Sequence, residues 1–220
     1  AKNADIKEVN IFSNASLLNH ENQELLLTSG VDLIFLSIDG FTAESYENIR
    51  VGLSFEVVKE NVLSLLREKK AKGNYKPIII VGGLRVKGDA SAFLKNNFCE
   101  EINKLSDGIW VGEHGDVHDL SGNVEGINYR RVPWYNLPCR RLWDALSILW
   151  DGSVDLCCID YEGTVNLGNI QKQSIRELWN EQRIKELRSY HLNKQFEKIE
   201  ICKNCFERPS WIPKNIERIL

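Results

Sequence analysis

Two nearly continuous apolar runs constrain the fold of this chain more than any other feature. Residues 31–38 read VDLIFLSI and residues 77–84 read PIIIVGGL, so neither run alternates strictly between polar and apolar side chains. Such runs are typical of parallel strands covered on both faces. Helical patterns separate them, and this alternation predicts βαβ units and a parallel sheet in an α/β fold. The other predicted elements are strands at 6–12 and 108–112 and helices at 20–29, 54–72 and 89–105.

The predicted helices carry apolar residues at helical spacing. In the helix at 20–29 we expect Leu25 and Leu26 to point inward, with Gly30 as the stop signal. Lysines in the last turns of the helix at 54–72, such as Lys69, suit the negative end of the helix dipole. The residues expected to face the core are Phe55, Val58, Val62, Leu65, Leu94, Phe98, Ile102 and Leu105, with Ser54 and Asp89 as caps.

The pattern changes in the C-terminal part of the chain. Residues 113–138 are rich in Gly, Asn, Asp and Pro, which indicates a long loop or linker. Asp151-Gly152 between the apolar runs at 146–150 and 154–158 predicts a β-hairpin. A capping box, Ser174 with Glu177, predicts a helix that extends to about His191. We therefore predict two domains, residues 1–130 and 131–220.

The composition excludes several classes of protein. Hydrophobic residues make up 43% of the 220 residues and charged residues 27%, which is typical of a folded globular chain. The net charge of −3 argues against a nucleic-acid partner, which would call for a basic excess. No apolar run approaches the roughly 20 residues of a membrane-spanning helix, and no signal peptide is apparent, so we expect a cytoplasmic protein without a membrane partner. The sequence starts at Ala1 and contains no Met, as expected of a processed or truncated piece or half of a split protein.

Five of the six cysteines lie between residues 139 and 205, which indicates metal binding rather than disulfides in a cytoplasmic chain. The pair Cys202-x-x-Cys205 places two thiolates on one side of a tight turn. Cys157 or Cys158 could supply a third ligand and Cys139 a fourth, although the adjacent pair cannot both point the same way from a strand. Four thiolates suit either zinc or an iron–sulfur cluster. We expect the sixth, Cys99, to be buried on the apolar side of a helix.

Two stretches of the chain resemble a known superfamily. Residues 31–40 (VDLIFLSIDG), followed by 46–50 (YENIR), resemble the middle of the radical SAM barrel. Residues 139–211, with Leu-Trp-Asp-Gly in the hairpin, Gly-Asn-Ile at 168–170 and Cys-x-x-Cys, resemble its SPASM or shorter twitch extension, which carries auxiliary 4Fe–4S clusters. The single thiol set is similar to the one-cluster twitch form. The resemblance implies strands three to six of a partial (β/α) barrel in residues 1–130, and a small α+β SPASM/twitch domain in 131–220.

The resemblance also implies roles for individual residues. Cys139, Cys157, Cys202 and Cys205 would ligate the auxiliary 4Fe–4S cluster, with Cys157 preferred to Cys158 because it matches the family cysteine three residues after the hairpin valine. The residues implied to bind S-adenosylmethionine are Ser37 and Asp39 near the ribose, Asn14 at the end of the preceding strand, and Arg50 near the methionine carboxylate, where a guanidinium offers a planar two-point match.

The sequence departs from the family in one respect. The Cys-x-x-x-Cys-x-x-Cys loop that normally holds the catalytic cluster is not among these 220 residues. We therefore expect another chain, or the rest of a longer enzyme, to supply the missing barrel strands. The implied activity is reductive cleavage of S-adenosylmethionine and hydrogen abstraction by the 5′-deoxyadenosyl radical, with an electron donor and a small-molecule or peptide substrate that is oxidised or modified. The alternatives are a non-enzymatic module held by zinc or a cluster, or an inactive truncated product.

A polar loop and a set of tryptophans are further candidates for a functional or structural role. The polar loop Glu113-His114-Gly115-Asp116-Val117-His118-Asp119 follows the last predicted strand, where it could move a proton or bind a metal. Five tryptophans are expected to pack in the core or to shield a cluster, since aromatic side chains bury large areas. They are Trp134, Trp143, Trp150, Trp179 and Trp211.

Overall fold

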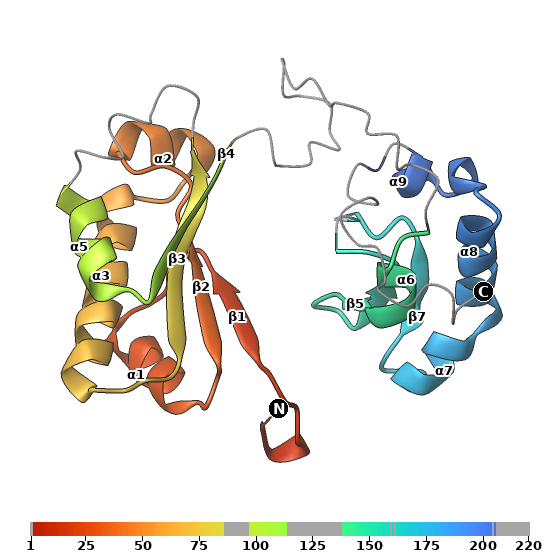
Figure 1. Ribbon diagram of the computed structural model, residues 1–220, viewed down its shortest axis with the longest axis horizontal. Coiled ribbons are helices and arrows are strands. Elements are labelled where there is room, and N and C mark those ends of the chain that lie inside the picture. Colours follow the sequence, from red (N-terminus) through yellow and green to blue (C-terminus); the bar gives the residue numbers. More distant parts are fainter. Residues whose placement is uncertain are drawn as a thin grey trace. The chain divides into compact units, whose positions relative to one another are not determined.

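The chain folds into two compact units, residues 1–117 and 118–220 (Figure 1). The computed structural model describes residues 2–85, 97–113, 138–158, 160, 162–203 and 205. Each unit has its own hydrophobic core. The domain boundary predicted at 130/131 lies outside the described residues, as do Asp89, Leu94, residues 114–119, Trp134 and Trp211.

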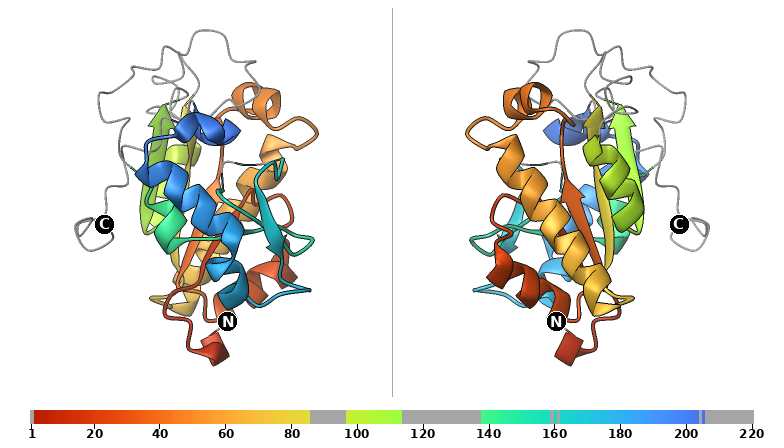
Figure 2. Two further views of the ribbon diagram at one scale, coloured as in Figure 1. Left: turned by 90° about the vertical axis from the view of Figure 1, so that its right-hand side faces the viewer. Right: turned by 90° about the vertical axis from the view of Figure 1, so that its left-hand side faces the viewer.

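The first unit is a four-stranded parallel sheet with helices on one face. Its strand order, β1-β2-β3-β4, is the order of the strands along the chain. Figure 2 (right) shows α1, α3 and α5 in front of the strands. The elements are η1 (Lys2–Ala4), β1 (Asn10–Ser13), α1 (His20–Thr28), β2 (Leu33–Ser37), α2 (Ala43–Ile49), α3 (Phe55–Lys72), β3 (Ile78–Arg85), α5 (Asn97–Leu105) and β4 (Gly108–Glu113).

The two faces of this sheet differ. Ile34, Leu36, Ile79 and Val81 alternate along β2 and β3, are fully buried, and belong to the same core as the apolar faces of α3 and α5. The opposite face carries an aromatic row: Phe12 stacks on Phe35 with ring centroids 5.3 Å apart, and Phe35 meets Trp110 at 5.9 Å. Phe12 and Trp110 stay exposed. The expectation of strands covered on both faces therefore holds for one face only within the described residues.

The second unit is a smaller α+β body. Its antiparallel sheet has the order β5-β6-β7, and its core contains Leu142, Val154, Leu167, Leu178 and Leu187. The elements are α6 (Arg141–Asp144), β5 (Ser147–Ile148), β6 (Ser153–Asp155), β7 (Asn166–Asn169), α7 (Ile175–Asn180), α8 (Gln182–Leu192), η2 (Phe196–Lys198) and α9 (Glu200–Lys203).

Several predictions for the first unit need correction. The first strand covers Asn10–Ser13 rather than residues 6–12. In α1, Leu25 is 60% exposed, whereas Gln23 is buried with Leu27. Gln23 is tolerated inside because its amide donates to the backbone oxygen of Leu18 at 2.6 Å and accepts from Ser64 Oγ at 3.0 Å. These hydrogen bonds therefore offset the free-energy cost of burying the polar side chain of Gln23.

Lys69 lies in the last turn of α3, as predicted, but it is buried. Its ammonium pairs with the carboxylate of Asp107, which also accepts the backbone N–H of Ile79 at 2.6 Å. One carboxylate thus joins α3 to β3. The helix α2 was not predicted; it begins at a capping box formed by Thr42 and Ser45.

Predictions for the second unit were confirmed in part. The hairpin forms around Asp151-Gly152, and the Ser174–Glu177 capping box is present. The helix predicted to reach His191 is in fact two helices, because Glu181 adopts an extended conformation between α7 and α8. The strand β7 was not predicted. Trp143 and Trp179 pack against the core as expected. Trp150 is 99% exposed, so the core prediction for it is wrong.

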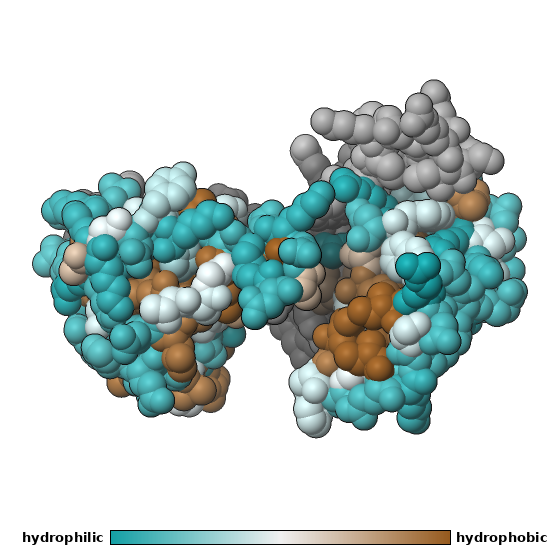
Figure 3. All heavy atoms as spheres, turned by 90° about the horizontal axis from the view of Figure 1, so that it is seen from below, coloured by the Kyte–Doolittle hydropathy of each residue, from teal (hydrophilic) through white to brown (hydrophobic). Residues whose placement is uncertain are grey.

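Apolar side chains also remain on the outside of each unit (Figure 3). In the first unit they include Phe12, Leu17 and Leu25, and in the second Ile148, Trp150 and Ile175. None of the helices in the described part of the chain is both long and apolar enough to cross a membrane.

Candidate metal centre and strand-end site

Polar side chains gather where β1 and β2 end. Ser13, the last residue of β1, is paired in register with Leu36, so the two parallel strands end at the same edge of the sheet. Ser37 closes β2 on the face of the aromatic row, and Asp39 follows two residues later. Asn14 follows β1 directly. Its side chain is engaged locally, accepting from Ser16 N at 3.1 Å and from Ser16 Oγ at 2.8 Å. The carboxyl ends of parallel strands are where α/β folds place functional groups.

The chain reverses direction at Gly40 and returns Arg50 to Asp39. Gly40 has φ +112°, and a Cβ there would lie 2.5 Å from the backbone nitrogen of Tyr46, so glycine is required. The helix α2 then ends at Ile49, and the guanidinium of the next residue, Arg50, donates to Asp39 Oδ2 as an ion pair. Asp39 itself is 6% exposed. The structure therefore brings together Asp39 and Arg50, which lie 11 residues apart in the sequence.

Two buried polar atoms beside this ion pair have no hydrogen-bond partner among the described residues. They are the hydroxyl of Tyr46, a fully buried residue, and Nε of Arg50. Burial raises the pKa of Tyr46; the charge of Arg50 lowers it to a smaller extent, and the charge of Asp39 adds to the increase. The hydroxyl therefore stays protonated and can donate. Unsatisfied buried donors are costly, and they fit a site that receives a polar ligand such as a carboxylate.

The cysteines of the second unit share one core. Cys202 is 7% exposed and belongs to the core cluster, and Cys139 and Cys157 are partly buried against it. Cys205 follows in a turn, with its N–H donating to the backbone oxygen of Cys202 at 3.3 Å. Cys158 is exposed, as expected if the adjacent cysteines point in different directions. The remaining cysteine, Cys99, is buried in the core of the first unit, as predicted.

The donor set of the second unit consists of thiols, which are ligands both of zinc and of iron–sulfur clusters. Among the residues that the structure describes, which include all five of these thiols, no three metal-ligating side chains lie close enough to hold one metal ion. The sulfur ligands of a cubane cluster are spread over its four irons and lie farther apart than those of one tetrahedral ion. An all-thiol set at a half-buried core edge suits such a cluster.

The loop that follows Cys157 is tightly organised by Asp160. Its N–H donates to the backbone oxygen of Cys157 at 3.0 Å. Its carboxylate accepts from Thr164 N at 2.9 Å and from Val165 N at 2.7 Å. Nearby Asp155 is fully buried, and that burial, reinforced by the charge of Asp160, raises its pKa. The backbone N–H groups of Thr164 and Val165 therefore hold the loop in place by donating to the carboxylate of Asp160.

Two residues of α8 support Cys139, and the sequence analysis missed both. His191 Nδ1 accepts the backbone N–H of Cys139 at 3.1 Å. Arg188 Nε donates to the backbone oxygen of Leu142 at 2.8 Å, and burial lowers the pKa of Arg188. A signal was present, since His191 continues the helical spacing of Ile184 and Leu187 on the apolar face of α8.

Comparisons with known proteins give one family match and several structural matches. Residues 139–206 match the SPASM family, described as an iron–sulfur cluster-binding domain. A comparison with curated protein sequences gave no match. Among solved structures, native anSMEcpe with bound AdoMet is 16% identical with a TM-score of 0.58, and the match covers 89% of this chain and 64% of that chain. Histidine-tagged anSMEcpe with bound AdoMet is 16% identical with a TM-score of 0.57, covering 88% and 61%.

A third structure, native anSMEcpe with bound AdoMet and Kp18Cys peptide, is 16% identical with a TM-score of 0.54, covering 89% of this chain and 65% of that chain. The chain thus spans just under two thirds of the length of each of these proteins. At this level of identity the likeness concerns the fold. The matched residues 139–206 lie within the second unit, and the likeness to the solved structures extends over most of the chain but concerns its fold alone.

Proposed function

We propose that this chain provides the S-adenosylmethionine-binding strand ends and the auxiliary 4Fe–4S cluster of a radical SAM enzyme. The enzyme would work in the cytoplasm and oxidise or otherwise modify a small molecule or a peptide. The observation that carries the proposal is the placement of Cys139, Cys157 and Cys202 against one core, with Cys205 one turn further, inside a domain of the SPASM family.

The four thiols have a defined task in this proposal. Cys139, Cys157, Cys202 and Cys205 would hold the cluster, and Cys157 is preferred to Cys158 because it packs on the core whereas Cys158 is exposed. When bound, such a cluster supplies one-electron transfer at a potential set by its ligands and surroundings. The half-buried position of the thiols limits the access of water to the site.

The strand-end residues would bind S-adenosylmethionine. Ser37 and Asp39 would hydrogen-bond the ribose, and Arg50 would meet the methionine carboxylate. Arg50 is held in place by Asp39, and the hydroxyl of Tyr46, which has no partner among the described residues, offers the carboxylate a further donor. Asn14, engaged in its own turn, would line the same edge from β1. A preorganised arrangement of this kind lowers the entropic cost of binding.

The peptide substrate class draws support from one of the matched structures, which holds a Kp18Cys peptide together with AdoMet. The exposed aromatic row of Phe12, Phe35 and Trp110 lies on the sheet face that bears Ser37. Such a surface can pack against an apolar side chain of a substrate. The alternative substrate class in this proposal is a small molecule. The enzyme would require an electron donor with either class of substrate.

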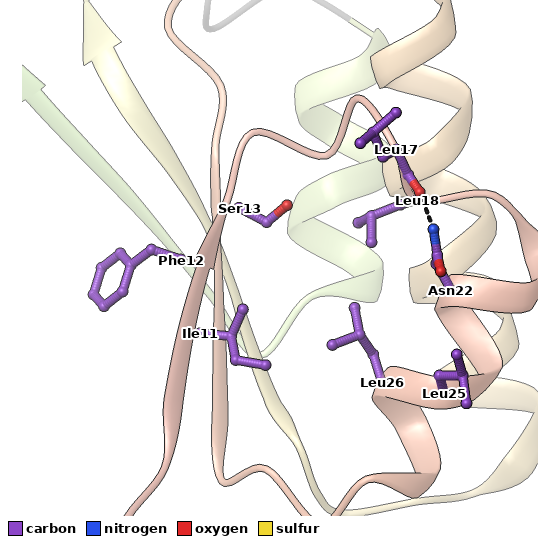
Figure 4. Close-up of a pocket in the computed structure, with 8 residues that line it drawn as sticks. All are labelled: Ile11, Phe12, Ser13, Leu17, Leu18, Asn22, Leu25 and Leu26. Atoms are coloured by element: carbon purple, nitrogen blue, oxygen red, sulfur yellow. Dashed lines mark hydrogen bonds between the residues drawn. The ribbon is translucent and has the colours of Figure 1, made fainter. Parts of the chain in front are cut away.

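We further propose that strand–helix units pair with the outer edge of β1. Among the described residues, β1 has a strand neighbour on one side only, β2. Beside it lies an open groove of about 320 Å³ between β1 and α1, whose apolar lining includes Ile11, Leu17, Leu25 and Leu26 (Figure 4). An added strand would satisfy the free backbone groups, and its helix would cover the groove.

Hydrogen exchange tests the edge proposal. In the chain by itself, the amides of Asn10–Ser13 should exchange faster than those of Leu33–Ser37, because an edge strand opens more readily. In the protein purified together with its partner segment, both strands should be equally protected. Equal protection in the chain alone would contradict the proposal.

The metal content tests the function. Iron, sulfide and zinc should be measured on anaerobically purified chain, beside Cys202→Ala and, as a control, Cys99→Ala in the other core. We expect about four iron and four sulfide per chain, lost in the first variant and kept in the second. One zinc and no iron would overturn the radical SAM proposal and leave a non-enzymatic binding module.

A further inference from the structure

One face of α8 holds the segment that carries Cys139 at two points. His191 Nδ1 accepts the N–H of Cys139 at 3.1 Å, and Arg188 Nε donates to the carbonyl of Leu142 at 2.8 Å. The two side chains are three residues apart, so they leave the helix on the same side. Both bonds are made to backbone atoms. The path of the chain from Cys139 into α6 is therefore set by α8.

His191 is fixed more firmly than a surface histidine would be. It is fully buried, and its ring meets the ring of Phe196 edge-on with centroids 5.0 Å apart. Phe196 lies in η2, the short helix that precedes α9 and Cys202. The imidazole thus contacts both the Cys139 segment and the segment leading to Cys202. A ring held from two sides gives the Cys139 N–H an acceptor of fixed position.

The chemistry of this bond constrains both partners. The bond constrains the orientation of the ring, because Nδ1 has to face the backbone N–H of Cys139 in order to accept it. The Cys139 N–H is in turn committed to His191. Backbone N–H groups next to a ligating cysteine otherwise donate to sulfur, and such bonds help to set the potential of an iron–sulfur cluster. His191 therefore decides where this donor points.

We propose that His191 is a positioning residue for the auxiliary cluster. By accepting the N–H of Cys139 it fixes the backbone of that ligand and hence the direction of its thiolate. It acts through Cys139 and touches no reacting atom. The inference rests on the proposed function, since it assumes that Cys139 is a cluster ligand. Partners of metal ligands that hold them in orientation typically contribute 10- to 100-fold to metal retention.

A pair of substitutions separates the hydrogen bond from the packing of the ring. In His191→Asn, the side-chain oxygen can take the place of Nδ1 and accept the same N–H. In His191→Leu, the apolar contact with Phe196 remains but the acceptor is lost. Both variants of the full chain should be reconstituted with iron and sulfide under anaerobic conditions. The readouts are the rate of iron loss to a ferrous chelator, the EPR spectrum of the reduced cluster and its midpoint potential.

We expect His191→Leu to lose iron about 10- to 100-fold faster than the wild type, with a changed EPR spectrum and a shifted potential. His191→Asn should stay close to the wild type in all three readouts. Ser189→Ala, a substitution in the same helix, serves as the matched control and should change nothing. The far-UV circular dichroism of each variant shows that the unit has folded.

The outcomes distinguish this inference from the proposed function. If the wild type binds iron and His191→Leu behaves like it, the positioning role is wrong while the cluster assignment stands. Equal loss of iron in the Asn and Leu variants would show that ring packing matters rather than the hydrogen bond, which also overturns the inference. A wild type that binds zinc and no iron overturns the proposed function, and the inference with it.

Discussion

The two units are stabilised in different ways. The first has strands of four to eight residues in one parallel sheet and a core built from long apolar runs. The second has strands of two to four residues, and its core edge contains three thiols. The first unit is built on the pairing of parallel strands and on an apolar core. In the second, the thiols proposed to hold the cluster lie in or against the core, so we expect metal binding and folding to be coupled in this unit. In the first unit we expect no such coupling.

Removal of the metal should have the largest effect and should separate the units. When iron is chelated from the reconstituted chain, we expect amides of β6, α8 and α9 to lose most of their protection against hydrogen exchange, because metal binding energy becomes folding energy. Amides of β2 and β3 should keep theirs. Hydrogen-exchange mass spectrometry with peptide resolution measures both at once, and uniform loss over the whole chain would break the comparison.

A core truncation in the first unit should come next in size. Ile34 is fully buried in β2, and Ile34→Ala should lower the free energy of unfolding by about 2–5 kcal/mol through lost burial and a residual cavity. Leu25→Ala, at a 60% exposed position of α1, is the control and should cost less than about 0.5 kcal/mol. Urea unfolding followed by circular dichroism compares them. A similar loss of unfolding free energy in the two variants would show that the apolar core is not the main source of stability in this unit.

Acid should weaken the first unit through Asp32. Hydrogen bonds from Lys2, Lys76 and the N–H of Val9 hold the pKa of Asp32 well below its usual range. Its contribution is present above the ordinary pKa of about 3.9 and is lost as the pH falls below that value, because the folded state resists protonation more than the unfolded state does. The urea midpoint of the wild type should therefore fall between about pH 5 and pH 2.

The variant Asp32→Asn should show a smaller fall over the same pH range, since the depressed carboxylate is gone. Asp5→Asn, an exposed position, should follow the wild type. If Asp32→Asn and the wild type lose the same stability in acid, the charge cluster at Asp32 is not the source of the effect. The pairs are exposed enough to be screened, so the difference should shrink as salt is added.

The smallest effect is expected at the tip of the β5–β6 hairpin. Trp150 is 99% exposed, so Trp150→Ser should change the free energy of unfolding by less than about 0.5 kcal/mol. The red-shifted part of the tryptophan fluorescence should disappear at the same time. A clear loss of stability would mean that Trp150 is covered in solution by a contact the isolated fold does not have.

The sequence was a good guide where burial is periodic and local. The parallel strands, the buried face of α3, the hairpin at Asp151-Gly152 and the cap at Ser174 all follow from patterns within a short window. Of the candidate ligands, Cys202 and Cys205 come from a local signal, Cys-x-x-Cys, whereas Cys139 and Cys157 were assigned through the family resemblance. The assignment of all four stays a prediction.

The failures arise where a distant partner decides. Lys69 is buried because Asp107, 38 residues away, receives its charge. Gln23 replaces Leu25 in the core because Ser64 and the backbone of Leu18 satisfy its amide. His191 is matched to Cys139 across 52 residues. No pattern along the chain encodes these pairings, since each polar group is stable inside only when its partner is already in place.

The agreement between strand order and chain order has a consequence for synthesis on the ribosome. Each of β2, β3 and β4 joins a neighbour that has already been made, so the sheet can grow in one direction as the chain emerges. Successive strands pair across long stretches of chain, with Leu33 opposite Ile78, so each new strand can pair only after the helix before it has been made. Each new strand is added at the edge opposite to β1, so that β1 stays at one edge of the described sheet throughout. A complementing segment could therefore join at any stage, during or after synthesis, without displacing a strand.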